Sequence, residues 1–425
     1  MTDTNYFHTT DFSEFNLSQL SQSPNFKVKE TRNFSNVKYH ENSKPEYSKD
    51  EYYKQYCRGV VVNMNTNRVV CVPTAKSIDN THFKQTFMEY SGTFTIEELI
   101  DGTMINMFWN EEDEDWEITT RTIVGADCRW TSSRSFRDLF YDIIESQFDT
   151  KEAFFGQYDK KYCFTFVMQH TDNRIVEPVT SNRLYLVDAH EIVYDEDNKL
   201  SVNNVYKYEF MLTQSYPHAV HTDTTKRDDI SKEDLYTLIM EKVSQKVSDY
   251  SKSYKQGVCI RLGNHRFNFK SDNYERYKFV KGNSPNPLYT YLNQRYNGLI
   301  KEHLKVFKED LANYNHYRDK VHIMTQELYD YYCSTFKQKT TSLKDDVPYQ
   351  LKPLCYELHG KYLEDKKPVH FKMVQEFVNK MVPQRMYFVL KFYFTYKIKD
   401  KNEKDPVPKH IHFHDDDTDA VLEEP

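Results

Sequence analysis

The chain has 425 residues, which is too long for one domain of ordinary size and predicts two or three domains with separate cores. Its formal net charge of -7 arises largely in the C-terminal tail, which carries six carboxylates, namely Asp415, Asp416, Asp417, Asp419, Glu423 and Glu424. The body is therefore nearly neutral. A neutral body excludes neither nucleic-acid nor protein partners, because binding depends on local charge.

The cysteines and the apolar segments predict a soluble intracellular protein. Seven cysteines occur without a CxxC pair, which argues against a disulfide framework and against a zinc knuckle. No run reaches the ~18 apolar residues of a membrane span, and no basic start is followed by an apolar stretch. We therefore expect a cytoplasmic location and no membrane partner. The 34 Tyr and 28 Phe are expected mainly in cores, although such rings also stack on bases.

Changes of pattern along the chain divide it into four segments. From Phe26 to about Tyr274 short β-like runs alternate with polar turns, and only two helical patterns interrupt them. After Asn286-Pro287 apolar residues recur at helical spacing instead. We predict an N-terminal extension (1–25), an α+β domain (26–282), an all-helical domain (283–400) and an acidic, disordered tail (401–425).

The α+β segment contains two predicted hairpins. Runs rich in valine at residues 60–62 and 69–72 flank a turn-rich spacer, and the runs at 105–109 and 116–120 flank an acidic one. β-branched and aromatic residues on both sides of such spacers are typical of paired strands. The acidic tip at residues 111–115 should point to solvent.

One helix of this segment is predicted from its apolar spacing. Apolar residues recur three and four apart from Phe136 to Phe148, and Ser133 stands before them as a predicted N-cap. The apolar face of this helix should cover a sheet. In the helical segment, the polar residues 338–347 are expected to form a loop between helices.

Six short stretches then stand out in order. They are Cys57–Val61 with Pro73–Lys76, Leu99–Met104, Thr119–Thr122, Cys163–Val167 with Asp172–Val176, Lys255–Ile260, and Asn268–Tyr274. Together they resemble the motifs of the RNA ligase 1 family, the phage-type ATP-dependent ligases of tRNA repair in the covalent nucleotidyltransferase superfamily. The resemblance implies a nucleotidyltransferase (ATP-grasp-like ligase) domain of antiparallel sheets with helices, followed by a helical domain.

The resemblance also places the catalytic positions, and this chain departs from the family at four of them. In the family a lysine amine at position 99 attacks the α-phosphorus of ATP, whereas Leu99 has no lone pair to donate. Asn268 likewise replaces a lysine, and Thr165 and Gln256 replace glutamates. The catalytic set is therefore degenerate, with no member intact.

The four replacements remove two cations and two anions, so the lost charges cancel. Removing only one would leave a buried charge unpaired at a cost of about 3–5 kcal/mol. Neutral Thr165 and Gln256 are also poor ligands for Mg²⁺, which prefers carboxylates, so we expect no metal site. Lys76 or Lys84 could replace the missing nucleophile, but neither occupies the motif position.

Other motif residues are intact and suit nucleotide or phosphate binding. By the resemblance these are Arg58, Lys76, Asp101, Gly102, Arg121 and Lys270. The cations could equally be ordinary scaffold charges, and Asp101-Gly102 could simply form a tight turn that needs glycine. No cofactor is required by the sequence; ATP or AMP with Mg²⁺ would follow only if binding or activity is retained.

Three functions remain open from the sequence. The first is a pseudoenzyme that lacks the nucleophilic lysine and is retained for RNA or nucleotide binding or as a subunit of a larger assembly. The second is an RNA ligase that joins 5'-phosphate or pre-adenylylated ends to 3'-hydroxyl ends, and the third is a purely structural interaction protein. RNA and protein partners are both expected candidates, and the composition rich in Tyr, Lys and Asn suits a viral or plasmid protein.

Two further signals have alternative explanations. His410, His412 and His414 have the spacing of a soft-metal site, but they lie in the acidic tail, where disorder is the expected state. The basic residues near Lys278 and Lys281 could contact RNA or form a solvated linker.

Overall fold

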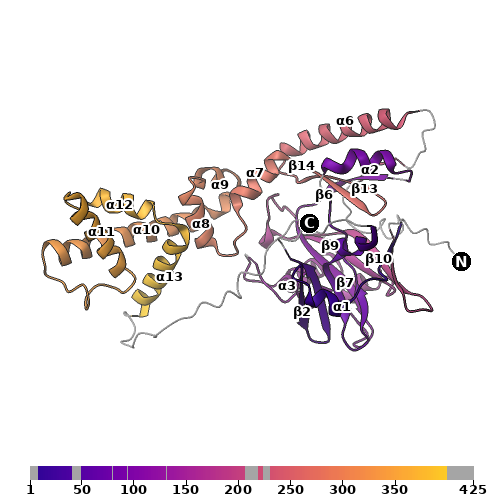
Figure 1. Cartoon of the computed structure of the whole chain (residues 1–425), viewed down its shortest axis with the longest axis horizontal. Coiled ribbons are helices and arrows are strands. Elements are labelled where there is room, and N and C mark those ends of the chain that lie inside the picture. Colours follow the sequence, from indigo (N-terminus) through magenta and orange to yellow (C-terminus); the bar gives the residue numbers. More distant parts are fainter. Residues whose placement is uncertain are drawn as a thin grey trace. The chain divides into compact units, whose positions relative to one another are not determined.

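The chain divides into two units at the boundary between Lys278 and Phe279. The computed structural model describes residues 8–40, 49–78, 80–92, 94–130, 132–205, 219–223 and 230–399. Within these residues the strands all belong to the first unit, and the second unit is helical (Figure 1). The predicted acidic tail and its three histidines lie outside the described residues.

Three antiparallel sheets make up most of the first unit. The six-stranded sheet has the order β1 (His8–Asp11), β11 (Leu200–Asn204), β10 (Arg183–Tyr194), β9 (Tyr162–Gln169), β7 (Thr103–Asn110), β8 (Asp115–Thr119). A second sheet has the order β12 (Ala219–Asp223), β6 (Phe94–Leu99), β13 (Gly257–Leu262), β14 (His265–Lys270). The third has the order β2 (Phe26–Thr31), β3 (Phe34–Tyr39), β4 (Arg58–Asn63), β5 (Arg68–Cys71). The predicted α+β class is confirmed.

Both predicted hairpins form. β4 pairs with β5, and β7 pairs with β8, each in antiparallel register. The acidic tip of the second hairpin is exposed as expected. Its Glu112 carboxylate accepts hydrogen bonds from Asn63 and Asn65, both at 2.9 Å, so the tip is tied to the turn of the first hairpin.

The helices of the first unit outnumber the two that the sequence patterns predict. They are α1 (Leu17–Gln22), α2 (Phe83–Glu89), α3 (Phe136–Gln147), α4 (Lys151–Phe155), α6 (Lys232–Ser251) and α7 (Asp272–Lys281), which crosses the unit boundary. Between Phe26 and Tyr274 the prediction of two helices was wrong, because α2 and α4 are too short to show a helical period. In the long α6 only Ile239 and Val243 are buried, so its apolar stripe is weak.

The predicted helix around residue 140 is present, with a different cap. Ser135, not Ser133, is the N-cap: its hydroxyl accepts a hydrogen bond from the Asp138 amide, and the Asp138 side chain accepts one from the Ser135 amide. This reciprocal pair is a capping box. Ser133 was a plausible choice only because spacing alone does not fix which serine turns the chain into the helix.

Each large sheet of the first unit has one apolar face covered by helices. The apolar faces of α3 and α4 pack on the six-stranded sheet, around residues such as Ile105 and Phe166. On the second sheet, α2 and α6 pack over Ile96, Val258 and Phe267 (Figure 1). Since side chains alternate along a strand, the opposite faces of both sheets are left for other residues.

The second unit is built from helices around one core. Its helices are α8 (Pro287–Tyr296), α9 (Ile300–Val306), α10 (Leu311–Tyr332), α11 (Lys352–Asp365), α12 (Phe371–Asn379) and α13 (Pro383–Lys399). Asn286 caps α8 and Pro287 stands in its first turn, which explains why the helical pattern begins there. Met324, Leu328, Leu354 and Leu358 are fully buried in this core. None of the helices described in either unit is long and apolar enough to cross a membrane.

Candidate functional site

The faces of the two sheets that no helix covers are called their open faces here, although other segments pack on them. On the six-stranded sheet the third sheet does so, with the Phe34 ring against Phe108 and Asn36 donating to Thr119 at 3.1 Å. This open face carries a buried polar row. Thr119, Asn106, Thr165 and Asp188 are paired in register across β8, β7, β9 and β10. The Thr165 hydroxyl donates to Asn106 Oδ1 at 2.9 Å, and both side chains are fully buried. Thr165 therefore satisfies its hydroxyl within the sheet.

The open face of the second sheet carries the other motif positions. The register aligns three rows of residues across β6, β13 and β14. The first row is Leu99, Gly257 and Lys270, the second is Glu97, Cys259 and Asn268, and the third is Thr95, Arg261 and Arg266. These residues alternate with those that pack under α2 and α6. Leu99, at the end of β6, is 4% exposed. Leu99, Lys270 and Asn268, three residues of the motif stretches, thus share one sheet face.

A buried ion triad joins the two open faces. Arg261 contacts Glu97 from its own sheet at 3.0 Å and Asp188 from the six-stranded sheet at 3.1 Å. All three side chains are 5% exposed or less. Burial raises the pKa of Asp188, but Arg261, together with His190, Thr74 and Arg266, outweighs burial, so the pKa of Asp188 lies well below its ordinary value. The sheets are therefore held face to face by charge as well as by packing.

Asp101 links three of the motif stretches. Its carboxylate accepts hydrogen bonds from the amides of Val176 at 2.8 Å and Glu177 at 2.9 Å, and from the Tyr274 hydroxyl at 2.6 Å. The Asp101 side chain is buried. Asp101 therefore serves as an internal brace between the loop after β6, the segment after β9 and helix α7.

Gly102 is required by a close approach of two backbones. A Cβ at this position would lie 2.5 Å from the Met168 carbonyl oxygen and 2.7 Å from Val167 Cγ1. The explanation from a tight turn is wrong, because Gly102 is not among the glycines with positive φ. The loop after β6 instead runs directly against β9.

We expect Gly102→Ala to lower the free energy of unfolding by about 1–3 kcal/mol, because the added methyl group forces the loop away from β9. Urea unfolding followed by circular dichroism measures this. Gly360→Ala is the matched control, since a Cβ at that helical position meets nothing within 4 Å. Equal effects of the two changes would contradict the close approach.

Three amides near the motif positions are buried with unpartnered atoms. Gln256 precedes Gly257 and is fully buried, and neither its Nε2 nor its Oε1 has a hydrogen-bond partner among the described residues. Asn268 donates to Ser77 Oγ at 2.6 Å, but its Oδ1 is buried without a partner there. Asn106 Nδ2 is likewise buried without a hydrogen-bond partner among the described residues. Gln256, Asn268 and Asn106 therefore leave hydrogen-bonding capacity inside the protein.

The four predicted phosphate-binding cations are held by different neighbours. Arg58 is buried in β4. The next residue, Gly59, has φ +121° and lies against the backbone of Arg121, so that a Cβ on Gly59 would be 2.8 Å from Arg121 Cα. The Lys76 ammonium lies 4.6 Å from the centre of the Tyr39 ring. Lys270 lies 3.8 Å from the carboxylate of Glu275. The fold thus joins the Arg58 and Arg121 segments and places Lys270 in the row of Leu99.

Lys84 does not lie on the sheet face of Leu99. Its ammonium lies 5.5 Å from the centre of the Tyr236 ring on α6. Helix α6 covers the apolar face of the second sheet, whereas Leu99 belongs to the opposite face. The sheet itself therefore separates the Lys84 amine from the motif position.

Several solved structures of ligases are similar to this chain. An archaeal ATP-dependent RNA ligase is 11% identical, with 70% of each chain covered and a TM-score of 0.41. A protein of Aquifex aeolicus assigned as an ATP-dependent DNA ligase is 10% identical over 82% of this chain and 80% of its own, with a TM-score of 0.39. An RNA ligase of Naegleria gruberi, solved with ATP and manganese, is 9% identical over 60% of this chain and 94% of its own, with a TM-score of 0.31. No protein-family profile and no curated protein sequence matches the chain.

The sequence patterns missed a charged cluster beside Asp101. Lys255 contacts Glu98 at 2.7 Å, and the Tyr250 hydroxyl donates to Glu98 at 3.4 Å. Burial raises the pKa of Glu177 to about 7, with Asp101 and Glu98 adding to the rise and Lys255 opposing it. Glu98 and Lys255 stand inside or beside the motif stretches, but nothing in their spacing distinguishes them from surface charges.

We expect the wild-type chain to lose stability as pH rises from about 4.5 to about 7, and we expect Glu177→Gln to abolish this loss. Because the folded pKa of Glu177 is raised, the folded chain holds a proton that the unfolded chain releases, so stability falls as pH rises through that window. Unfolding free energies measured across the window should slope less in the variant. Glu145→Gln, a change at an exposed carboxylate, is the control and should keep the slope.

The donor set of the two open faces does not fit Mg²⁺. The carboxylates of Asp101, Glu97 and Asp188 are occupied by internal hydrogen bonds and by Arg261. Thr165 and Gln256 are neutral, whereas Mg²⁺ prefers charged oxygen ligands in octahedral geometry. Within the described residues, no group of three or more His, Cys, Asp or Glu side chains could hold a metal ion.

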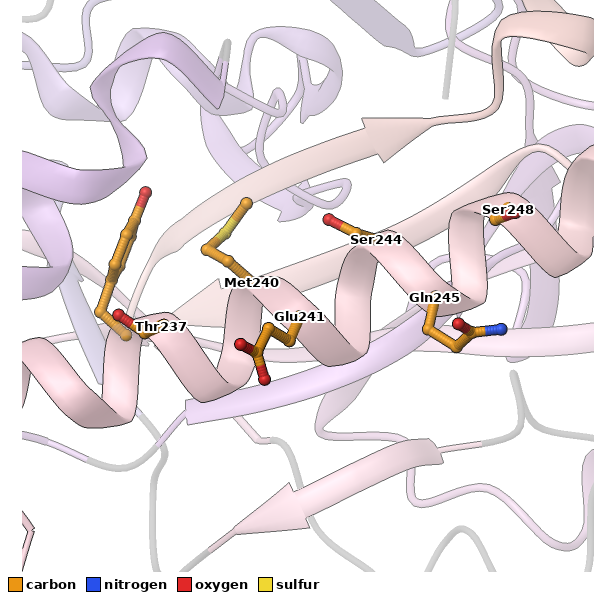
Figure 2. A pocket seen from close by; sticks show the side chains of 7 residues that line it. Thr237, Met240, Glu241, Ser244, Gln245 and Ser248 are labelled. Carbon is orange, nitrogen blue, oxygen red and sulfur yellow. The ribbon is translucent and has the colours of Figure 1, made fainter.

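A separate surface groove runs along α6 and contains none of these motif residues. Its volume is about 600 Å³, and α6 side chains that include Thr237, Glu241, Ser244 and Gln245 line it (Figure 2). The groove has no cation and only one carboxylate in its lining. It therefore offers no phosphate site, and the candidate site remains on the open sheet faces.

Proposed function

We propose that this chain is an RNA-ligase-like protein that binds a nucleotide or an RNA end without forming a lysine–AMP adduct. One observation carries the proposal: the hydrocarbon side chain of Leu99 is buried in the row of Gly257 and Lys270, where the family resemblance requires an amine. A nucleotide could contact this face, but the face offers no lone pair at that point. The chemistry that the resemblance implies would then stop before its first covalent step.

The size of the expected loss supports this reading. Removing the nucleophile of an enzyme costs on the order of 10⁶ in rate even when its neighbours remain. Here the neighbours Thr165, Gln256 and Asn268 are neutral as well. Lys255 pairs with Glu98, so its amine is also engaged.

Retained binding is supported by groups that need a partner. Buried amide atoms without hydrogen bonds cost about 1–3 kcal/mol each, and three motif-associated side chains carry such atoms. Lys270 adds a cation in the row of Leu99. A phosphate bound at this face would add a second anion beside Lys270, which already lies 3.8 Å from the Glu275 carboxylate.

Incubation with α-labelled ATP and Mg²⁺, followed by denaturing electrophoresis, tests the missing adduct. We expect no labelled band, and a band that survives denaturation would contradict the proposal. Binding is tested separately by equilibrium titration of ATP and of 5'-phosphorylated RNA. RNA affinity that falls steeply as salt rises would support phosphate contacts.

A second function, joining of pre-adenylylated RNA, is favoured by the intact brace at Asp101. The Tyr274 hydroxyl and the amides of Val176 and Glu177 hold the loop after β6 in place without any lysine. Sealing of a 5'-adenylylated donor to a 3'-hydroxyl acceptor needs no attachment lysine. Sealing without ATP would establish this function, whereas its absence together with absent RNA binding at low salt would favour a structural interaction protein.

A further inference from the structure

Two buried cysteines lie against each other where the third sheet packs on the six-stranded sheet. Cys71 is the last residue of β5 and Cys163 lies in β9, and both belong to one buried cluster. The Cys163 sulfur accepts a hydrogen bond from the Val72 amide at 3.3 Å, and its thiol donates to the Val72 carbonyl oxygen at 3.5 Å. The side chains of Cys71 and Cys163 are also hydrogen-bonded to each other. The fold therefore joins two thiols from segments that are far apart along the chain.

The surroundings make the two thiols chemically different. Burial raises the pKa of the Cys71 thiol, and the hydrogen bond to Cys163 raises it further. Burial also raises the pKa of Cys163, but interactions with Cys71, His190 and the Val72 amide outweigh burial, so the pKa of Cys163 is lowered. His190 stands opposite Cys163 in the register of β10 and β9. Since the thiolate is the nucleophilic form of cysteine, Cys163 is the attacking sulfur of the pair and Cys71 is the sulfur that reacts second.

We propose that Cys71 and Cys163 form a redox site at which hydrogen peroxide converts the two thiols into a reversible disulfide. In the first step the Cys163 thiolate attacks one peroxide oxygen and the O–O bond breaks. Cys163 becomes a sulfenic acid, and the hydroxide that leaves takes up the proton released by Cys163 to give water. In the second step the Cys71 sulfur attacks the sulfenic sulfur, the S–O bond breaks, and hydroxide leaves with the Cys71 proton as a second water. Two thiols are oxidised and one peroxide is reduced.

The oxidant reaches this pair by local opening of β5. No ligand pocket is needed, because the reaction partner of Cys163 is Cys71 itself and hydrogen peroxide is little larger than water. Strand β5 has four residues, and within the described part of the chain it pairs with β4 alone, at the end of its sheet. Short edge strands with few neighbours open at a free energy well below that of global unfolding. Opening of β5 at Cys71 uncovers the pair.

The disulfide would link the third sheet to the six-stranded sheet beside two of the motif stretches. Pro73–Lys76 begins two residues after Cys71, and Thr165 lies two residues after Cys163. The redox state of the pair therefore acts on segments that border the candidate site. The inference does not depend on the proposed binding function, because it concerns sulfur chemistry within the fold.

Peptide mass spectrometry of the oxidised full chain tests the proposal. The folded chain is treated with hydrogen peroxide, the remaining thiols are blocked with N-ethylmaleimide in urea, and the digest is analysed without a reductant. We expect one dominant pair of joined peptides, with Cys71 linked to Cys163, which dithiothreitol separates. The proposal is overturned if Cys71 and Cys163 are blocked as fully as in the untreated chain, or if Cys71 is joined to another cysteine instead.

Three variants assign the roles of the two sulfurs. In Cys71→Ala the sulfenic acid has no thiol to react with, so dimedone, a reagent for sulfenic acids, should label Cys163. In Cys163→Ala we expect Cys71 to stay reduced. Cys57→Ala is the matched control, because Cys57 is buried in the same cluster but its thiol faces the Tyr53 carbonyl oxygen, and this variant should keep the disulfide.

The variants can also contradict the order of attack. Dimedone labelling of Cys71 in Cys163→Ala, together with none of Cys163 in Cys71→Ala, would show that Cys71 attacks the peroxide first. Loss of the disulfide in a folded Cys57→Ala chain would show that the assigned pair is not sufficient. If a variant does not fold, the peptide map of the wild-type chain still decides whether Cys71 and Cys163 are joined.

Discussion

Leu99→Lys alone is expected to destabilise the chain and to leave it without an AMP adduct. The side chain at this position is 4% exposed, and none of the glutamates that would balance a lysine in the family is present. A buried, uncompensated ammonium costs about 3–5 kcal/mol, which is a large part of the stability of a typical domain. Urea unfolding measures the loss, and denaturing electrophoresis after incubation with labelled ATP measures the adduct.

The complete charge set provides the control for this prediction. The variant with Leu99→Lys, Thr165→Glu, Gln256→Glu and Asn268→Lys adds two cations and two anions and should be more stable than Leu99→Lys alone. That order follows if the four charges compensate one another. A fully stable Leu99→Lys single variant that forms an adduct would show that the charges were not lost as a balanced set.

Arg261→Met is expected to lower the free energy of unfolding by about 3–5 kcal/mol, because it leaves Glu97 and Asp188 as buried carboxylates without their cation. The triple variant with Glu97→Gln and Asp188→Asn should recover much of the loss. Chemical denaturation at neutral pH measures all three chains. Arg318→Met breaks an exposed pair with Asp319 and should cost less than about 1 kcal/mol.

The effect of Arg261→Met should also depend on pH in a definite direction. In the wild-type chain the pKa of Asp188 is lowered, so its contribution to stability is present above the ordinary carboxyl pKa and is lost as pH falls. In the variant both carboxylates can take up protons, which removes the buried charge. The difference between the two chains should therefore shrink toward about pH 4. A constant difference would contradict a charge-based role for Arg261.

Local patterns predicted the elements that depend on neighbouring residues. Alternating β-branched runs around polar spacers gave the β4–β5 and β7–β8 hairpins, and apolar spacing gave the buried face of α3. The change of pattern at Asn286-Pro287 coincides with the start of α8. These features follow from turn chemistry and periodicity, which act over a few residues.

Other features could not be predicted because they depend on distant segments. Helices α2 and α4 are short, and α6 buries only two side chains, so none has a strong periodic signal. The need for glycine at position 102 comes from the Met168 carbonyl, more than sixty residues away. The raised pKa of Glu177 likewise requires burial beside Asp101 and Glu98.

By itself the sequence determined that leucine stands at position 99 and that the side chains at 165, 256 and 268 are neutral, since these are facts of residue type. That they replace catalytic residues is what the family resemblance implies. Only the tertiary structure decided how that region is organised. It pairs Leu99 with Gly257 across two strands, turns the Asp101 carboxylate inward, and buries Glu97, Arg261 and Asp188 together between two sheets. Strand register and burial set these contacts, and both arise from the packing of segments that are far apart along the chain.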